Sequence, residues 1–217
     1  MARVGWELVR FRDRAQAAQL LAQALRPLGL ERPVILGIPR GGVVLADILA
    51  RALGGTADVV FARKIGAPGH EEFALGAVGE DGSIYLQPYA HRYASEAYLE
   101  AEARRQQAVI AERAERYRAV RPKVPLTGRD VVIVDDGIAT GSTVEAAIQA
   151  VRAEHPRRLV VAIPVAPPEA LERLQRQAEV VCLYTPVPFG AVGAFYQDFP
   201  QVSDQEVLET LSAWADL

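Results

Sequence analysis

The sequence predicts an α/β protein with a mostly parallel central sheet and helices on both of its faces. Short runs of β-branched and apolar residues alternate along the chain with stretches of helical periodicity. Strands that alternate with helices are joined by right-handed crossovers, which make neighbouring strands parallel and cover the sheet. Glycine-rich turns follow several of these runs, and in such sheets ligands bind beyond the carboxyl ends of the strands.

Each element has a local reason in the sequence. Asp13 is a candidate cap for the first helix, because its side-chain oxygen can accept from the free N–H groups there. Gly54 can end the second helix in the left-handed conformation. The long polar helix over 95–119 has a thin apolar stripe, so we expect it on the surface. The expected helices cover 13–28, 43–53, 95–119, 144–152, 168–177 and 203–215, and the expected strands cover 33–38, 57–62, 131–134, 158–164 and 180–184.

We expect the chain to form a single domain over 1–217. Within it, 65–121 should form an insertion, made of a glycine-rich hairpin that turns at 80–82 and of the long helix. The segment 184–201 is rich in proline, glycine and aromatic residues and should form a separate unit near the end of the sheet.

The composition argues against several classes of function. The 217 residues are 50% hydrophobic, which is enough for one packed core, and the formal net charge is −3. This mild acidity gives no electrostatic footprint for nucleic acid. We find neither a signal peptide nor an apolar run long enough to cross a bilayer, so we expect a cytoplasmic protein without a membrane partner. The single cysteine, Cys182, excludes a disulfide within the chain.

The most informative stretch is 131–143, where an apolar strand ends in two carboxylates and a turn rich in glycine and hydroxyl groups. Backbone N–H groups at such a turn and at the start of the next helix carry partial positive charge, which suits a phosphate. Gly137 and Gly141 allow the backbone to approach it closely. The hydroxyl donors are Thr140, Ser142 and Thr143.

Asp135 and Asp136 are poorly suited to contact the phosphate itself, because like charges repel. Their oxygens can instead accept hydrogen bonds from a vicinal diol or help to hold a hydrated Mg²⁺. A ribose 5-phosphate has this layout. A structural alternative is that Ser142 and Glu145 form a capping box, but this leaves the two adjacent acids unexplained. Neither a nucleotide P-loop nor a Gly-x-Gly-x-x-Gly motif occurs.

This stretch, with two acids, a short spacer and Thr-Gly-x-Thr, resembles the phosphoribosyl-pyrophosphate (PRPP) signature of type I phosphoribosyltransferases. The resemblance implies transfer of a 5-phosphoribosyl group from Mg-PRPP to a nitrogenous base, with release of pyrophosphate. It also implies Mg²⁺ as the cofactor, held indirectly by Asp135 and Asp136. The residues that it assigns to PRPP are Asp135, Asp136, Gly137, Ile138, Ala139, Thr140, Gly141, Ser142 and Thr143.

Two other loops resemble parts of the same family. Arg40, Gly41 and Gly42 resemble the pyrophosphate loop, in which backbone N–H groups and a basic side chain hold the leaving group. Arg63 and Lys64, expected at the end of the 57–62 strand, resemble a basic site that reaches the pyrophosphate. The resemblance therefore gives Arg40 and Lys64 catalytic roles and makes the other three PRPP contacts. The alternative for each basic side chain is ordinary solvation.

The segments 66–79 and 184–201 resemble the family's mobile lid and its hood, which receives the base. In the lid, His70 would donate to the leaving group and Glu71 or Glu72 would help the base. The alternative is that these are exposed loop residues. In the hood, the alternative is that the aromatic residues anchor the loop to the core. The hood candidates for contact with the base are Phe195, Tyr196, Asp198 and Phe199.

The sequence does not identify the acceptor. Ala139 lies where purine-salvage members often carry Asp, and Ala-Thr-Gly is common in adenine and uracil enzymes, so a 6-oxopurine is less favoured. The alternative function is a non-catalytic regulator of the same fold that senses PRPP or a nucleotide. A third hypothesis is an interaction subunit that uses the exposed 95–119 helix. A homo-oligomer is left open.

Overall fold

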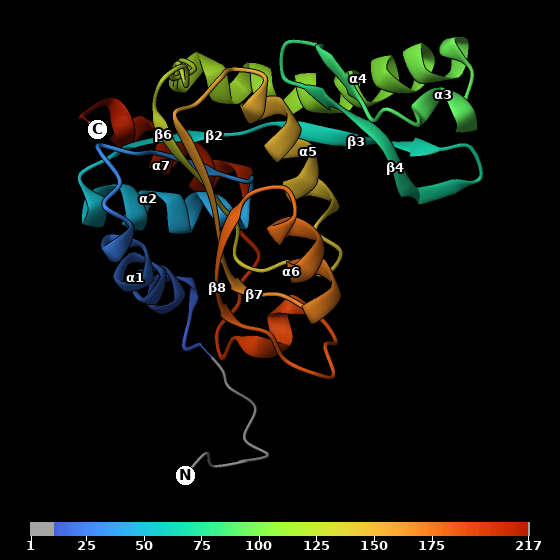
Figure 1. The fold of residues 1–217 in the computed structure, drawn as a ribbon. Helices are drawn as coiled ribbons and strands as arrows, with labels where there is room; N and C mark the ends of the chain where they lie inside the picture. Colours follow the sequence, from blue (N-terminus) through green and yellow to red (C-terminus); the bar gives the residue numbers. More distant parts are fainter. Residues whose placement is uncertain (1–10, 217) are drawn as a thin grey trace.

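The computed structural model describes residues 11–216 and contains two sheets. The larger is a five-stranded parallel sheet in the order β2-β1-β6-β7-β8, with helices on both faces (Figure 1). Its strands are β1 (Val34–Gly37), β2 (Thr56–Val59), β6 (Asp130–Val134), β7 (Arg158–Val165) and β8 (Glu179–Tyr184). The predicted fold class is confirmed.

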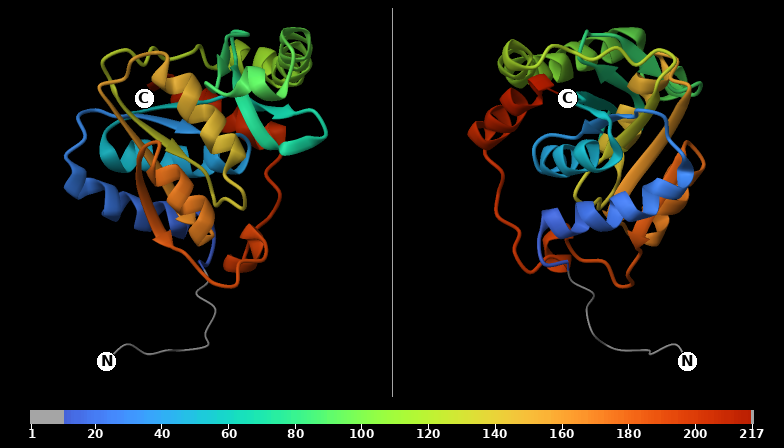
Figure 2. Two further views of the ribbon diagram at one scale, coloured as in Figure 1. Left: turned by 45° about the vertical axis from the view of Figure 1, so that its right-hand side comes forward. Right: turned by 90° about the vertical axis from the view of Figure 1, so that its left-hand side faces the viewer.

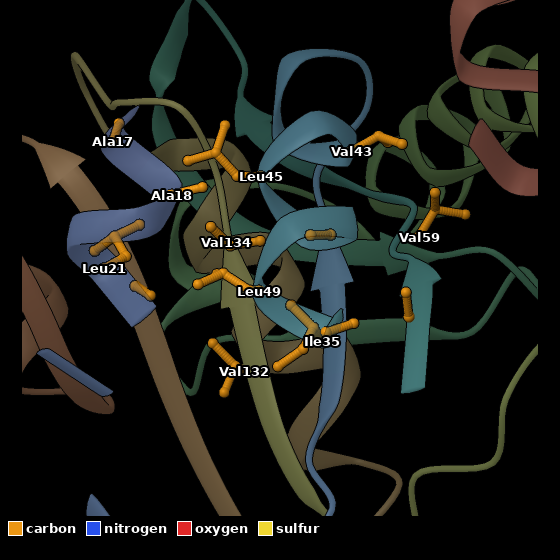
Figure 3. Close-up of a cluster of buried hydrophobic side chains, with 14 of the residues drawn as sticks. Ala17, Ala18, Leu21, Ile35, Val43, Leu45, Leu49, Val59, Val132 and Val134 are labelled. Atoms are coloured by element: carbon orange, nitrogen blue, oxygen red, sulfur yellow. The ribbon is translucent and has the colours of Figure 1, made fainter. Parts of the chain in front are cut away.

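Alternate residues of the central strands face opposite sides of this sheet, and each side has its own core. On one side Val132 and Val134 belong to the same cluster as Leu45 and Leu49, which Figure 3 shows pointing toward the strands. On the other side Val131 and Ile133 share a cluster with apolar residues of the following helices. The first side is covered by α1 (Arg14–Leu25) and α2 (Gly41–Leu53), and the second by α5 (Ser142–Arg152) and α6 (Pro168–Gln175).

The second sheet is antiparallel and has the order β3-β4-β5. Its elements and the helices beside it are β3 (Ala62–Ala67), β4 (His70–Gly79), β5 (Ile84–Leu86), α3 (Ala90–Tyr93) and α4 (Glu96–Val120). Figure 1 shows this sheet and α4 extending away from the five-stranded sheet. Leu99 and Ala103 of α4 pack against Ile65 and Leu75, whereas its polar face stays exposed, as expected. The predicted turn at 80–82 joins β4 to β5.

The expected strand over 57–62 is wrong in its second half. The last pair between β1 and β2 is Gly37 with Val59, because β1 ends at Gly37 and offers no further partner. After a final hydrogen bond from Val60 N to Gly37 O (3.2 Å), the chain leaves this sheet and begins β3. Arg63 and Lys64 therefore lie within the second sheet, not at the end of a strand of the first.

The first described residue pairs with the 195–197 segment. Phe11 N donates to Phe195 O and Gln197 N to Phe11 O, both at 2.7 Å. A capping box at Ser203 begins α7 (Asp204–Ser212), and η1 (Arg26–Leu28), η2 (Val192–Phe195) and η3 (Ala213–Asp216) are short 3-10 turns. Figure 2 shows α1 close to the C-terminal segment that contains η2. None of the helices in the described range 11–216 is both long and apolar enough to cross a membrane.

Candidate functional site

The PRPP-like turn connects the central strand β6 to α5. Gly141 is the N-cap of α5, with a φ of +80° that favours glycine, and it provides no side-chain cap. The alternative, a capping box of Ser142 and Glu145, is absent: the N-cap is Gly141, and Glu145 pairs with Arg173 of α6. Gly141 has no side chain to cap the first N–H groups of α5, although Ser142 N donates a long hydrogen bond to Oγ1 of Thr140 at 3.4 Å. N–H groups at a helix start suit an anion.

Gly137 lets the turn pack closely against the next strand. A Cβ at this position would lie 2.5 Å from Cγ1 of Val192 and 2.9 Å from Cγ1 of Val165. Ile138 N donates to Val165 O at 3.1 Å, which fixes the turn to the end of β7. By contrast Ala139 and Thr140 are exposed, so they are accessible to a ligand.

The two carboxylates differ in their surroundings. The amide of Asp136 donates to Oδ1 of Asp135 at 2.8 Å. Burial, and then the neighbouring charge of Asp136, raise the pKa of Asp135 well above its usual range. A hydrogen-bond donor in the site would stabilise its charged form. Asp136 already has such a donor within the protein, since Nε of Arg14 lies 2.9 Å from its Oδ2.

The Arg40–Gly42 loop lies directly beside the PRPP-like turn, as the parallel pairing of β1 with β6 requires. Ile38 N donates to Val134 O at 3.0 Å. A Cβ on Gly42 would stand 2.7 Å from the same carbonyl oxygen, and one on Gly41 would overlap Oδ2 of Asp136. Arg40 is half-buried at the N-cap of α2. The two strand ends thus bring two paired glycines against the carboxylates, and the charge of the adjacent Arg40 acts on Tyr117 and Asp204.

Arg63 and Lys64 lie on β3, where each has a partner. Nε of Arg63 donates to Gln106 Oε1 at 2.6 Å, and Nζ of Lys64 is 3.1 Å from Glu72 Oε2. Both basic residues line a cleft of about 460 Å³ that also includes Ser142 and Thr143. The structure therefore brings them to the start of α5, although from a different sheet than the sequence predicted.

The segment that resembles the family's lid belongs to the hairpin of β3 and β4. Ala67 pairs with His70 across the turn at Pro68 and Gly69, and β4 continues from His70. His70, Glu71 and Glu72 are exposed on β4. A second cleft of about 580 Å³ includes Glu72 together with Ala139 and Thr140.

The 184–201 segment is anchored by its aromatic side chains. Phe195 is 4% exposed and Tyr196 is 3% exposed, so neither ring offers a face on which a base could stack. The hydroxyl of Tyr196 donates to Asp136 O at 2.6 Å. Their rings fill the core instead, as in the alternative that these aromatic residues anchor the loop. Asp198 is exposed, and Phe199 is half-buried with the guanidinium of Arg14 over its ring.

Sequence reasoning missed Arg14 and Arg173. Arg173 donates to Thr140 O and pairs with Glu145, and thus joins α6 to both sides of the turn. Arg14 lies on the buried face of α1, and its spacing from Ala17, Ala18 and Leu21 is a helical repeat that could have revealed this. Among the side chains described, no group of three or more His, Cys, Asp or Glu is arranged to hold a metal.

Known proteins resemble nearly the whole chain. A family model for the phosphoribosyl transferase domain matches residues 12–189. Proteins of Mycobacterium tuberculosis strains H37Rv and CDC 1551, named provisionally as phosphoribosyl transferases, are 45% identical over 204 residues and 93% of this chain. The match covers 46% of their length, so the chain spans about half of these relatives.

A solved structure agrees with the fold. The crystal structure of TT1426 from Thermus thermophilus has a TM-score of 0.94 and 63% sequence identity, and the match covers 95% of this chain and 99% of that one. The extent of the family match and the identity to the curated relatives show that this chain belongs to the phosphoribosyl transferase domain family.

Proposed function

We propose that this domain transfers a 5-phosphoribosyl group from Mg-PRPP to a nitrogenous base or a related acceptor, with release of pyrophosphate, in the cytoplasm. The observation that carries the proposal is the meeting of two loops at the ends of neighbouring parallel strands. One is a glycine turn that begins α5 and follows two carboxylates, and the other is the Arg40–Gly42 loop in contact with Asp136. A sugar that carries a phosphate at one end and a pyrophosphate at the other could place one of these groups at each loop.

In this proposal the turn from Gly137 to Thr143 holds the 5-phosphate through backbone N–H groups and hydroxyls. Asp135 and Asp136 accept hydrogen bonds from the ribose hydroxyls. A bound diol would donate to Asp135, whose charge is otherwise penalised by burial. Arg40 neutralises the departing pyrophosphate, while Lys64 and Arg63 supply positive charge from the hairpin.

The reaction places modest demands on the protein. Loss of pyrophosphate gives C1 an oxocarbenium-like character, so the protein needs to provide positioning and charge neutralisation, not a nucleophile. Adjacent carboxylates are the hard oxygen donors that Mg²⁺ prefers, and this ion is commonly held by one or two carboxylates together with substrate phosphates. When bound, Mg²⁺ would supply further charge neutralisation on the pyrophosphate.

The test is to measure binding of Mg-PRPP by calorimetry, followed by pyrophosphate release with a panel of purine and pyrimidine bases. We expect binding, and release that depends on one class of base. Binding without consumption by any base would favour the regulator of the same fold. An absence of binding would contradict both hypotheses. Asp136→Asn should weaken PRPP binding about 10–100-fold, as expected when a hydrogen bond to a charged group is lost.

A further inference from the structure

Asp136 is held by Arg14, a cation 122 residues earlier in the sequence. Arg14 begins α1, and its Nε donates to Oδ2 of Asp136 at 2.9 Å. The side chains are 10% and 14% exposed, respectively, so water screens this pair only weakly. An isolated charge would be unfavourable at either position, and each side chain therefore depends on the other.

Three contacts fix the guanidinium in one orientation. Besides its bond to Asp136, Arg14 donates through Nη1 to Pro200 O at 2.7 Å. Its Cζ atom stands 3.9 Å from the centre of the Phe199 ring, which is a cation–π arrangement. Only a planar fork can make these contacts together, so lysine is not an equivalent residue here.

The backbone of Asp136 is held by the same C-terminal segment. Tyr196 donates its hydroxyl to Asp136 O at 2.6 Å, and its ring stacks on Phe199 at 4.7 Å between centroids. Asp198 N donates to Arg12 O at 2.9 Å, which joins this segment to the residues just before α1. Asp136 is thus fixed at its carboxylate by Arg14 of α1 and at its carbonyl by Tyr196.

We propose that Arg14 is a positioning residue for the sugar site: it binds Oδ2 of Asp136 and turns Oδ1 toward a hydroxyl of the ribose phosphate. This inference rests on the proposed function, because it assumes that Asp136 receives the sugar. It adds α1 and the 196–200 segment to the residues that determine PRPP affinity. Arg14 acts through Asp136 and contacts no reacting atom.

The chain contains a matched control at the other end of the same strand. Asp130 begins β6, is buried, and accepts from Nε and Nη2 of Arg157 at 2.7 and 2.6 Å. This is also an Arg–Asp pair with a buried carboxylate, although the Arg157 side chain is 49% exposed, and it lies at the strand end remote from the turn. Loss of Arg157 should therefore affect stability without affecting the sugar.

The experiment compares Arg14→Gln, Arg14→Lys and Arg157→Gln with the wild type by thermal unfolding, by calorimetric titration with Mg-PRPP and ribose 5-phosphate, and by steady-state kinetics. We expect Arg14→Gln to weaken binding of both ligands about 10-fold or more, and to raise KM for PRPP more than it lowers kcat. Arg14→Lys should bind with intermediate affinity. Arg157→Gln should lower Tm while Kd stays at the wild-type value.

The outcomes separate this inference from the proposed function. If the wild type binds neither ligand, both are overturned. If the wild type binds PRPP but Arg14→Gln binds it equally or more tightly, only the role of Arg14 is overturned. Arg14→Lys serves as the second variant should Arg14→Gln not fold. If Arg14→Lys binds PRPP with wild-type affinity but has a lowered Tm, the Arg14–Asp136 pair is purely structural and the role of Arg14 is overturned.

Discussion

Gly41 lies against the carboxylate of Asp136, so closely that a Cβ added to Gly41 would overlap Oδ2 of Asp136 and stand 3.2 Å from Nε of Arg14. The requirement for glycine here comes from this contact and not from an unusual backbone angle. The atom that would be struck is the end of a side chain, so it can move without disturbing the backbone. The loop after β1 and the turn after β6 are therefore in direct contact.

Gly41→Ala should weaken PRPP binding while the protein stays folded. The methyl group would displace the Asp136 carboxylate from Arg14 and from the position proposed for a sugar hydroxyl. Loss of the hydrogen bond between this charged carboxylate and the sugar corresponds to about a 10–100-fold change in Kd. Alanine also favours the first turn of α2, which opposes any loss of stability. Calorimetric titration with Mg-PRPP and a thermal melt measure the two effects separately.

Gly190→Ala is the control for this substitution. Gly190 lies in the 184–201 segment, and a Cβ there would meet no heavy atom within 4 Å. Its Kd and Tm should match the wild type. A Gly41→Ala protein that binds PRPP with wild-type affinity would contradict the role given to Asp136 as a sugar ligand.

Asp130→Asn should destabilise the protein in a pH-dependent way. Hydrogen bonds from Arg157, aided by the amide of Glu31, hold the pKa of Asp130 below its ordinary value of 3.8. An acid with a lowered folded pKa stabilises the native state above its unfolded pKa, and this contribution is lost as the pH falls through the folded pKa. At neutral pH the substitution should cost about 1.5–3 kcal/mol, the range for hydrogen bonds to charged groups.

Urea unfolding of wild type and Asp130→Asn checks this expectation between about pH 3 and pH 7, because carboxyl groups ordinarily titrate within roughly this range. The difference in the free energy of unfolding should be constant near neutral pH and shrink as the pH falls below 3.8. A difference that grows toward acid pH would reverse the sign and refute the assignment. PRPP affinity should stay unchanged, since Asp130 is at the far end of β6.

The parts of the site that the sequence predicted are those encoded by adjacent residues. The strand, the two acids and the glycine turn over 131–143 are contiguous, so local pattern and spacing sufficed. The position of Gly41 and Gly42 beside that turn then followed from parallel strand order, because such strands end at one edge of the sheet. Local chemistry and topology together placed these two loops.

What the sequence did not predict depends on distant partners. The strand from Ala57 stops at Val59 only because its neighbour β1 ends at Gly37, and that length is a property of the pair. Whether Phe195 and Tyr196 face a ligand or the core depends on their ring partners. These are Tyr184 and Phe189 for Phe195, and Phe11 and Phe199 for Tyr196. Arg14 was overlooked because an arginine near a helix start is usually solvated, and its partner is 122 residues away.

Cys182 should react slowly with thiol reagents in the native protein. Burial raises the pKa of its thiol, and Sγ lies 3.3 Å from Tyr184 O. Since the thiolate is the reactive form, a raised pKa and limited access both reduce the rate. Titration with Ellman's reagent near neutral pH should give slow release of one equivalent, and rapid release after unfolding in urea. A native rate equal to that of the unfolded chain would contradict this environment.

Lys64 and Glu72 allow a test of whether the hairpin supplies charge to the site. Their ion pair has a 3.1 Å separation, and the Glu72 side chain is 82% exposed, so it should contribute only about 0–1 kcal/mol to stability. Glu72→Gln should therefore leave Tm unchanged and free the Lys64 ammonium for the cleft shared with Ser142.

We expect Lys64→Met to reduce pyrophosphate release from PRPP, with Glu72→Gln equal to or faster than the wild type. Assays at low and high salt add a second readout, because screening should slow the wild type more than Lys64→Met. Equal rates for wild type and Lys64→Met would remove Lys64 from the charge-neutralising role and leave Arg40 and Arg63 as the residues proposed for it.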